Sequence, residues 1–142
     1  MSLPEDDPTQ PSAGPEPLRV FVVENHNDTR ALLTLLMEQN GHLVQSASSV
    51  AEALERFAES RSQVLVADLG LPDGTGWELL ERLRAEQPEP LVYAIAMSGF
   101  GSQADRNRSR AAGFRHHLVK PVEPGRLDAL LDEARRERDA AP

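Results

Sequence analysis

Short apolar runs alternate with longer segments of helical spacing along most of this chain. The runs are rich in β-branched residues, as expected of strands that are buried on both faces. They cover residues 19–23, 42–45, 64–67, 91–96 and 114–119. Between them, apolar residues recur at intervals of three and four, which is typical of amphipathic helices. This alternation predicts an α/β fold with a five-stranded parallel sheet and helices on both faces.

Apolar stripes mark four of the predicted helices, whereas the remaining one, 101–112, is polar and rich in arginine. The positions expected to face the core are Leu32, Leu35 and Leu36, then Ala53, Leu54, Phe57 and Ala58, then Trp77, Leu80 and Leu83, and finally Leu127, Leu130, Leu131 and Ala134. Asn27 or Asp28 is predicted to cap the first helix. Thr75 and Glu78 have the spacing of a capping box ahead of the third.

Composition and charge narrow the class of protein. The chain has 142 residues, enough for one core, and its lack of cysteine excludes disulfides, thiolate metal clusters and thiol nucleophiles. Residues 1–17 are acidic and rich in proline, which predicts a disordered tail or linker before a domain at 18–138. Without the tail the chain still carries 19 acidic against 15 basic side chains, which argues against nucleic-acid binding.

No apolar stretch is long enough to cross a bilayer, and the N-terminus has no basic-then-apolar signal pattern. We therefore expect a cytoplasmic protein whose chain makes no contact with a membrane.

Polar residues follow the predicted strands at the edge where parallel sheets bind ligands. Glu24 follows the first strand, Asp68 the third and Ser98 the fourth. Lys120, the only lysine beside fourteen arginines, follows the fifth. This set indicates phosphoryl chemistry, with Asp68 as a nucleophile that needs no separate base. Glu24 would help to hold Mg²⁺, while Lys120 and Ser98 would contact phosphoryl oxygens.

A family resemblance rests on four segments in this order: RVFVVEN (19–25), VLVADLGLPDGTGWELL (64–80), AIAMSGFG (94–101) and HHLVKP (116–121). Together they resemble the receiver domain of two-component response regulators. The resemblance implies a flavodoxin-like (βα)5 fold. It also implies phosphoryl transfer from a phosphohistidine, on a sensor histidine kinase or a histidine phosphotransfer protein, with the help of Mg²⁺. Enzymatic character would be limited to catalysing the domain's own phosphorylation and dephosphorylation, and the phosphorylated state would bind an unknown downstream protein.

The resemblance also assigns roles to matching positions. Asp68 matches the phosphoacceptor, and Lys120 matches the lysine that pairs with the phosphoryl group. Ser98 matches the hydroxyl that turns onto a phosphoryl oxygen, and His117 occupies the position of the aromatic switch residue. The bond before Pro121 matches a peptide bond that is usually cis in this family.

Three further positions match the family's metal ligands. Glu24 and Asn25 match the acidic pair that organises Mg²⁺, and the backbone carbonyl of Gly70 matches the main-chain ligand. Asn25 departs from the family pattern because it places a neutral amide where a carboxylate is usual. Since the number of charged ligands tunes the affinity of such sites, Mg²⁺ should bind more weakly here. The alternative reading is therefore a pseudo-receiver, an interaction module that is not phosphorylated.

Two other functions suit the sequence less well. Phosphatases with an aspartate nucleophile need a second Asp two residues later, where this chain has Gly70. A nucleotide or flavin site would require a glycine-rich loop after the first strand, and none is present. The receiver reading leaves two architectures, a stand-alone regulator or the terminal receiver of a hybrid sensor histidine kinase. The proline-rich leader and the short final helix slightly favour the second.

Overall fold

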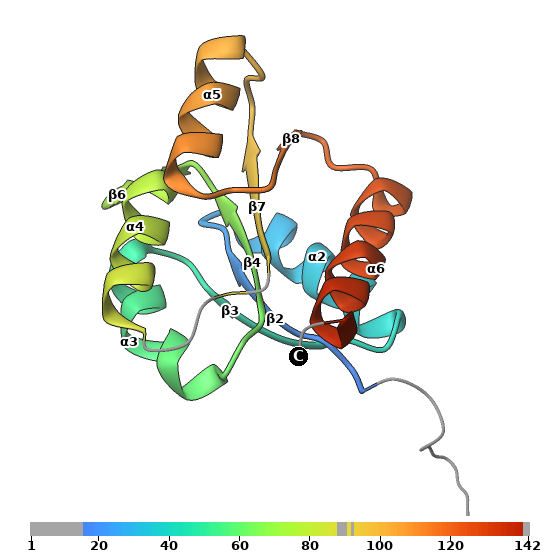
Figure 1. The fold of residues 1–142 in the computed structure, drawn as a ribbon. Helices are drawn as coiled ribbons and strands as arrows, with labels where there is room; N and C mark the ends of the chain where they lie inside the picture. Colours follow the sequence, from blue (N-terminus) through green and yellow to red (C-terminus); the bar gives the residue numbers. More distant parts are fainter. Residues whose placement is uncertain (1–15, 88–90, 92, 141–142) are drawn as a thin grey trace, which may run out of the picture.

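The computed structural model describes residues 16–87, 91 and 93–140, so the predicted tail lies outside the described residues except for 16 and 17. A parallel sheet forms the centre, in the strand order β3-β2-β4-β7-β8 (Figure 1). Its strands are β2 (Arg19–Val23), β3 (Leu43–Ala47), β4 (Val64–Asp68), β7 (Tyr93–Ser98) and β8 (His116–Val119). The predicted α/β fold is thus confirmed, with strand ends shifted by one or two residues.

Helices cover both faces of the sheet (Figure 1). They are α2 (Asn27–Gln39), α3 (Val50–Ser60), α4 (Gly76–Glu86), α5 (Gln103–Ala112) and α6 (Pro124–Ala140). One core layer joins α3, α4 and the end of α5 to the sheet, and the other joins α2 and α6 to the opposite face. Successive residues of a strand point to opposite faces of the sheet, so Phe21 packs in the first core layer and Val20 and Val22 pack in the second. Burial on both faces explains why the strands are continuous apolar runs.

The core-facing side of α2 differs from the prediction. Leu33 and Met37 are buried, whereas the predicted Leu32 and Leu35 are 55% and 52% exposed. Adjacent leucine pairs at 32–33 and 35–36 allow two faces, and packing against α6 and the sheet selects one of them. In α3, Ala58 is likewise exposed, but the predicted stripe of α6 is buried throughout.

The caps of the helices show one correction. His26 caps α2, because its Nδ1 accepts a hydrogen bond of 3.4 Å from the Thr29 amide. The predicted caps Asn27 and Asp28 are already helical, and Asp28 lies in the first turn, where a negative charge favours the helix N-terminus. The capping box of Thr75 with its partner at the third helical position is formed as predicted.

A short hairpin follows β4 and was not predicted. It pairs β5 (Gly70–Leu71) with β6 (Gly74–Thr75). Asp73 lies between the two strands of this hairpin. The Asp73 carboxylate accepts hydrogen bonds from the amides of Ala51 (2.9 Å) and Val50 (2.8 Å), and these bonds hold the pKa of Asp73 below its ordinary value. The loop after β4 is therefore fixed to the start of α3.

At the end of the domain opposite to this hairpin, Arg138 near the end of α6 binds the first described residues. Its guanidinium donates to the carbonyl oxygens of Glu16 at 2.7 Å and Pro17 at 3.0 Å. This contact lies beside the amino ends of the strands, far from the loops that follow them (Figure 1). Within the described residues, no helix has the length and apolarity to cross a membrane.

Candidate functional site

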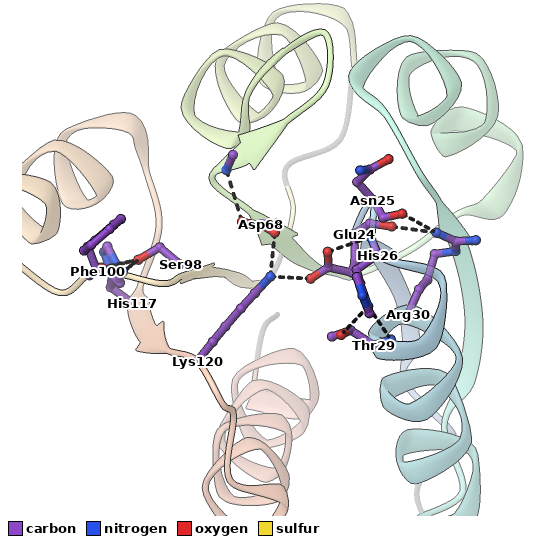
Figure 2. Close-up of polar contacts among 11 residues, drawn as sticks. Glu24, Asn25, His26, Thr29, Arg30, Asp68, Ser98, Phe100, His117 and Lys120 are labelled. Atoms are coloured by element: carbon purple, nitrogen blue, oxygen red, sulfur yellow. Dashed lines mark hydrogen bonds and ion pairs between the residues drawn. The ribbon is translucent and has the colours of Figure 1, made fainter.

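Two carboxylates and the sole lysine meet at the carboxyl edge of the sheet (Figure 2). Lys120 Nζ lies 2.6 Å from Asp68 Oδ2 and 2.6 Å from Glu24 Oε1. Asp68 is the last residue of β4, while Glu24 directly follows β2 and Lys120 directly follows β8. These strands are separated along the chain but parallel in the sheet. The topology therefore brings together residues that the sequence placed only at separate strand ends.

Glu24, Asp68 and Lys120 form an ion-pair triad that is largely withdrawn from water. The side chain of Glu24 is 2% exposed, that of Asp68 12% and that of Lys120 28%. Burial by itself lowers the pKa of Lys120, but the hydrogen bonds and charges of Asp68 and Glu24 outweigh it and raise that pKa. Lys120 is thus held as an ammonium, which balances two carboxylates in a poorly solvated position.

The remaining carboxylate oxygens of the triad are bound to the main chain. Asp68 Oδ1 accepts from the amide of Gly70 at 3.1 Å, and Glu24 Oε2 accepts from the amide of His26 at 2.9 Å. Arg30, which the sequence did not single out, donates to the carbonyl oxygen of Glu24 at 2.7 Å. These bonds orient both carboxylates before any ligand arrives.

The oxygen atoms at this edge suit a hard cation. Carboxylates of Asp68 and Glu24, the exposed side chain of Asn25 next to Glu24, and the carbonyl of Gly70 are donors of the kind that Mg²⁺ prefers. Among the described residues, however, no three metal-ligating Asp, Glu, His or Cys side chains are grouped as they would be around an ion. The donor set thus fits Mg²⁺ in its chemistry, with one negative charge fewer than three carboxylates would supply.

Ser98 lies at the end of β7, next to Lys120, the residue that follows β8. The amide of Lys120 donates to the Ser98 carbonyl at 2.8 Å. Its hydroxyl donates to the carbonyl oxygen of Phe100 and lies 2.7 Å from His117 Nε2 (Figure 2). Ser98 is buried, whereas the Phe100 ring is 77% exposed. The peptide bond between Lys120 and Pro121 is cis, as the resemblance implied.

One residue of the site carried no signal in the sequence. Gly76, the first residue of α4, passes so close to β4 that an added Cβ would lie 2.6 Å from the carbonyl oxygen of Asp68. The same Cβ would lie 3.1 Å from Leu69 Cδ2. The absence of a side chain at this position therefore permits the observed approach of α4 to the end of β4.

Comparison with known proteins agrees with this geometry. Residues 20–132 match the family described as the response regulator receiver domain. The chain is 32% identical over 114 residues to an uncharacterized 14.6 kDa protein in the sodA1 3′ region of Leptolyngbya boryana, covering 80% of this chain and 87% of that protein. It is 33% identical over 129 residues to the virulence sensor protein BvgS of Bordetella pertussis, which covers 87% of this chain but only 10% of BvgS.

Solved structures share the fold. The crystal structure of a CheY-like response regulator receiver domain protein from Methanospirillum hungatei superposes with a TM-score of 0.77 at 23% identity, covering 88% of this chain and 99% of that one. At this identity the likeness shows the architecture alone. The family match spans far more than half of the chain, however, and the sheet brings the matching acidic, hydroxyl and lysine side chains to one edge. The chain therefore belongs to the response regulator receiver domain family of two-component signalling.

Proposed function

We propose that this receiver domain accepts a phosphoryl group on the carboxylate of Asp68. Receiver domains interact with histidine kinases or histidine phosphotransfer proteins, and we propose a phosphohistidine of such a protein as the donor. A carboxylate oxygen attacks phosphorus, the bond from phosphorus to the imidazole nitrogen breaks, and the donor histidine leaves with the electron pair. The observation that carries this proposal is the direct 2.6 Å contact of Asp68 with Lys120 at the open edge of the sheet.

Receiver domains in general depend on Mg²⁺, which offsets the negative charge that gathers on phosphoryl oxygens. In this chain we propose Asp68, Glu24, the Asn25 amide oxygen and the Gly70 carbonyl as its ligands. The main-chain hydrogen bonds to Glu24 and Asp68 support this assignment, because they hold both carboxylates in place while leaving lone pairs free.

Lys120 and Ser98 are proposed to hold the product. The Lys120 ammonium already touches the acceptor carboxylate, so it lies beside the place where phosphoryl oxygens would form. The Ser98 hydroxyl would turn from Phe100 to one of these oxygens, and His117, its neighbour, would respond. This change would alter the surface made by β7, α5 and β8, where we propose that an unknown downstream protein binds.

The wider setting of the domain also belongs to this proposal. We propose residues 18–138 as the functional domain and the cytoplasm as the place where it meets its phosphodonor. Similarity both to a short protein and to a long sensor protein is compatible with a stand-alone regulator and with the terminal receiver of a hybrid kinase. The domain would catalyse only its own phosphorylation and dephosphorylation.

Incubation with acetyl phosphate and Mg²⁺ tests the acceptor. We expect intact-mass spectrometry to detect one phosphate adduct on the wild-type protein and none on Asp68→Asn, because the amide is not a nucleophile. Chelation of Mg²⁺ by EDTA should prevent the adduct as well. A folded wild-type protein that gains no phosphate under these conditions would favour the pseudo-receiver alternative.

A second prediction concerns the affinity of the proposed metal site for Mg²⁺. Asn25→Asp adds a carboxylate next to Glu24, and we expect the affinity for Mg²⁺ to rise about tenfold, or roughly 1.4 kcal/mol. Isothermal titration calorimetry measures this. Asn27→Asp is the matched control, since Asn27 is an exposed neighbour and the change adds the same charge. An equal rise in both variants would show that net charge, rather than ligation at position 25, controls binding.

A further inference from the structure

We propose that the state of Asp68 is passed to helices α4 and α5 through a relay of side-chain hydrogen bonds. The members of this relay, in order from the site, are Ser98, His117, Ser109 and Trp77. The proposal deepens the proposed function, since it assumes that the Ser98 hydroxyl turns to the phosphoryl group. It adds Ser109 and Trp77, which touch neither the phosphoacceptor nor the metal ligands.

The relay joins four consecutive elements of the chain, namely α4, β7, α5 and β8. Ser98 Oγ at the end of β7 lies 2.7 Å from His117 Nε2 on β8. The other ring nitrogen, His117 Nδ1, lies 3.0 Å from Ser109 Oγ on α5. Ser109 Oγ in turn accepts from Trp77 Nε1 on α4 at 2.9 Å. A single imidazole ring therefore connects the site at the sheet edge to two helices.

The hydrogen inventory of these groups fixes the direction of the bonds. The Phe100 carbonyl can only accept, so the hydroxyl hydrogen of Ser98 is used there. His117 Nε2 must then donate to Ser98 Oγ. In the neutral ring Nδ1 is consequently an acceptor, and Ser109 supplies its hydrogen. Trp77 Nε1 can only donate, and Ser109 Oγ has the lone pairs to accept it. Every polar group in the relay thus has a partner.

The relay contains a buried hydroxyl group, that of Ser109, whose hydrogen bonds cannot be replaced by water. Ser109 is 1% exposed and lies on the core side of α5, where an alanine would pack as well. A hydroxyl in such a place needs partners, and within the described residues its side chain is bonded to His117 and Trp77. The Trp77 ring is half-buried against α5 and carries the guanidinium of Arg108 at 5.2 Å from its centre. A shift of His117 therefore cannot leave Ser109 and Trp77 unchanged.

Ser98 is the two-state element. In the structure its hydroxyl is committed to Phe100 and His117; on the phosphorylated protein it would be committed to a phosphoryl oxygen. His117 Nε2 would then keep only the Phe100 carbonyl, which lies 3.2 Å away. The ring would move toward that acceptor, and the change would reach Ser109 through Nδ1. Ser98 therefore has two hydrogen-bonding arrangements, and the state of Asp68 and the position of His117 both favour one or the other. Coupling between separate places in a protein requires such a shared two-state element.

The first test needs no phosphate. The chain has one tryptophan, so a ¹⁵N-labelled sample gives a single indole N–H resonance. We expect Nε2 of His117 to carry a proton, and Ser98→Ala to shift the indole resonance. The shift should vanish in a His117→Phe background. Protonation at Nδ1 instead, or an equal shift in both backgrounds, would overturn the relay.

The second test uses acetyl phosphate and Mg²⁺, with the adduct followed by mass. In the wild-type protein the indole resonance should move as the adduct accumulates. In Ser109→Ala the adduct should form to the same extent while this movement falls by at least half; Arg108→Ala, which alters the surroundings of the same ring outside the relay, should keep it. An undiminished movement in Ser109→Ala refutes the relay. Failure of every variant to gain phosphate refutes the proposed function, and the first test still decides the relay.

Discussion

Lys120→Met is expected to lower the free energy of unfolding by about 3 kcal/mol or more at neutral pH, because it removes one partner of a buried ion pair. Glu24 and Asp68 would remain side by side, 2% and 12% exposed, without the ammonium that balances them. Methionine keeps most of the apolar part of the lysine side chain, so the loss of stability reflects the missing positive charge rather than missing side-chain volume. Urea unfolding in EDTA measures it.

Arg115→Met is the matched control for this change. Arg115 and Glu137 are also 2.6 Å apart, but their side chains are 47% and 36% exposed. Solvent screening should limit this loss to under about 1 kcal/mol. A further Asp68→Asn change in the Lys120→Met protein should restore stability, since it removes one of the unbalanced charges. Equal losses for Lys120 and Arg115 would mean that burial of the triad does not govern its energetics.

Gly76→Ala should lower the free energy of unfolding by about 2 kcal/mol, in the range for inserting a group into closely packed structure. The added Cβ would lie 2.6 Å from the carbonyl oxygen of Asp68, and neither backbone segment is free to yield cheaply. The contact would also displace Asp68, the proposed phosphoacceptor, so adduct formation with acetyl phosphate should slow. Thermal unfolding and intact-mass spectrometry measure the two effects.

Gly70→Ala is the comparison for Gly76. Within the described part of the chain, no heavy atom outside its own neighbourhood lies within 4 Å of a Cβ at Gly70. The same chemical change should therefore alter stability by no more than a few tenths of a kcal/mol, as is usual at unencumbered surface positions. If Gly76→Ala proves equally mild, α4 can retreat from β4 without strain, and the close approach has no role in placing Asp68.

The strands were predictable because burial on both faces leaves little choice of residue. Val64, Leu65 and Val66 are all fully buried, so the run itself identifies the strand whichever side each residue faces. Helix faces were less predictable. In α2 the choice between Leu32 and Leu33 depends on tertiary packing, and α5 has only Ser109 and Ala112 buried, which leaves no apolar stripe.

The residues of the site also differ in whether the sequence alone could predict them. Asp68, Glu24 and Lys120 could be expected together because parallel strands bring their carboxyl ends to one edge. Gly76 and Ser109 could not, because their importance arises from how α4 and α5 dock on the sheet. No local pattern distinguishes a helix-start glycine that touches a neighbouring strand from one that faces water. His26 acts as a cap through a ring nitrogen, which residue preferences for caps do not anticipate.

Arg138 has a practical consequence. By binding the main chain at Glu16 and Pro17, it holds these two residues and the end of the last helix together at one side of the domain. An affinity handle or biosensor tether attached at Glu16 would thus leave the edge that holds Glu24, Asp68 and Lys120 turned toward the solution. Immobilised protein should then capture the phosphodonor proposed above as well as free protein does.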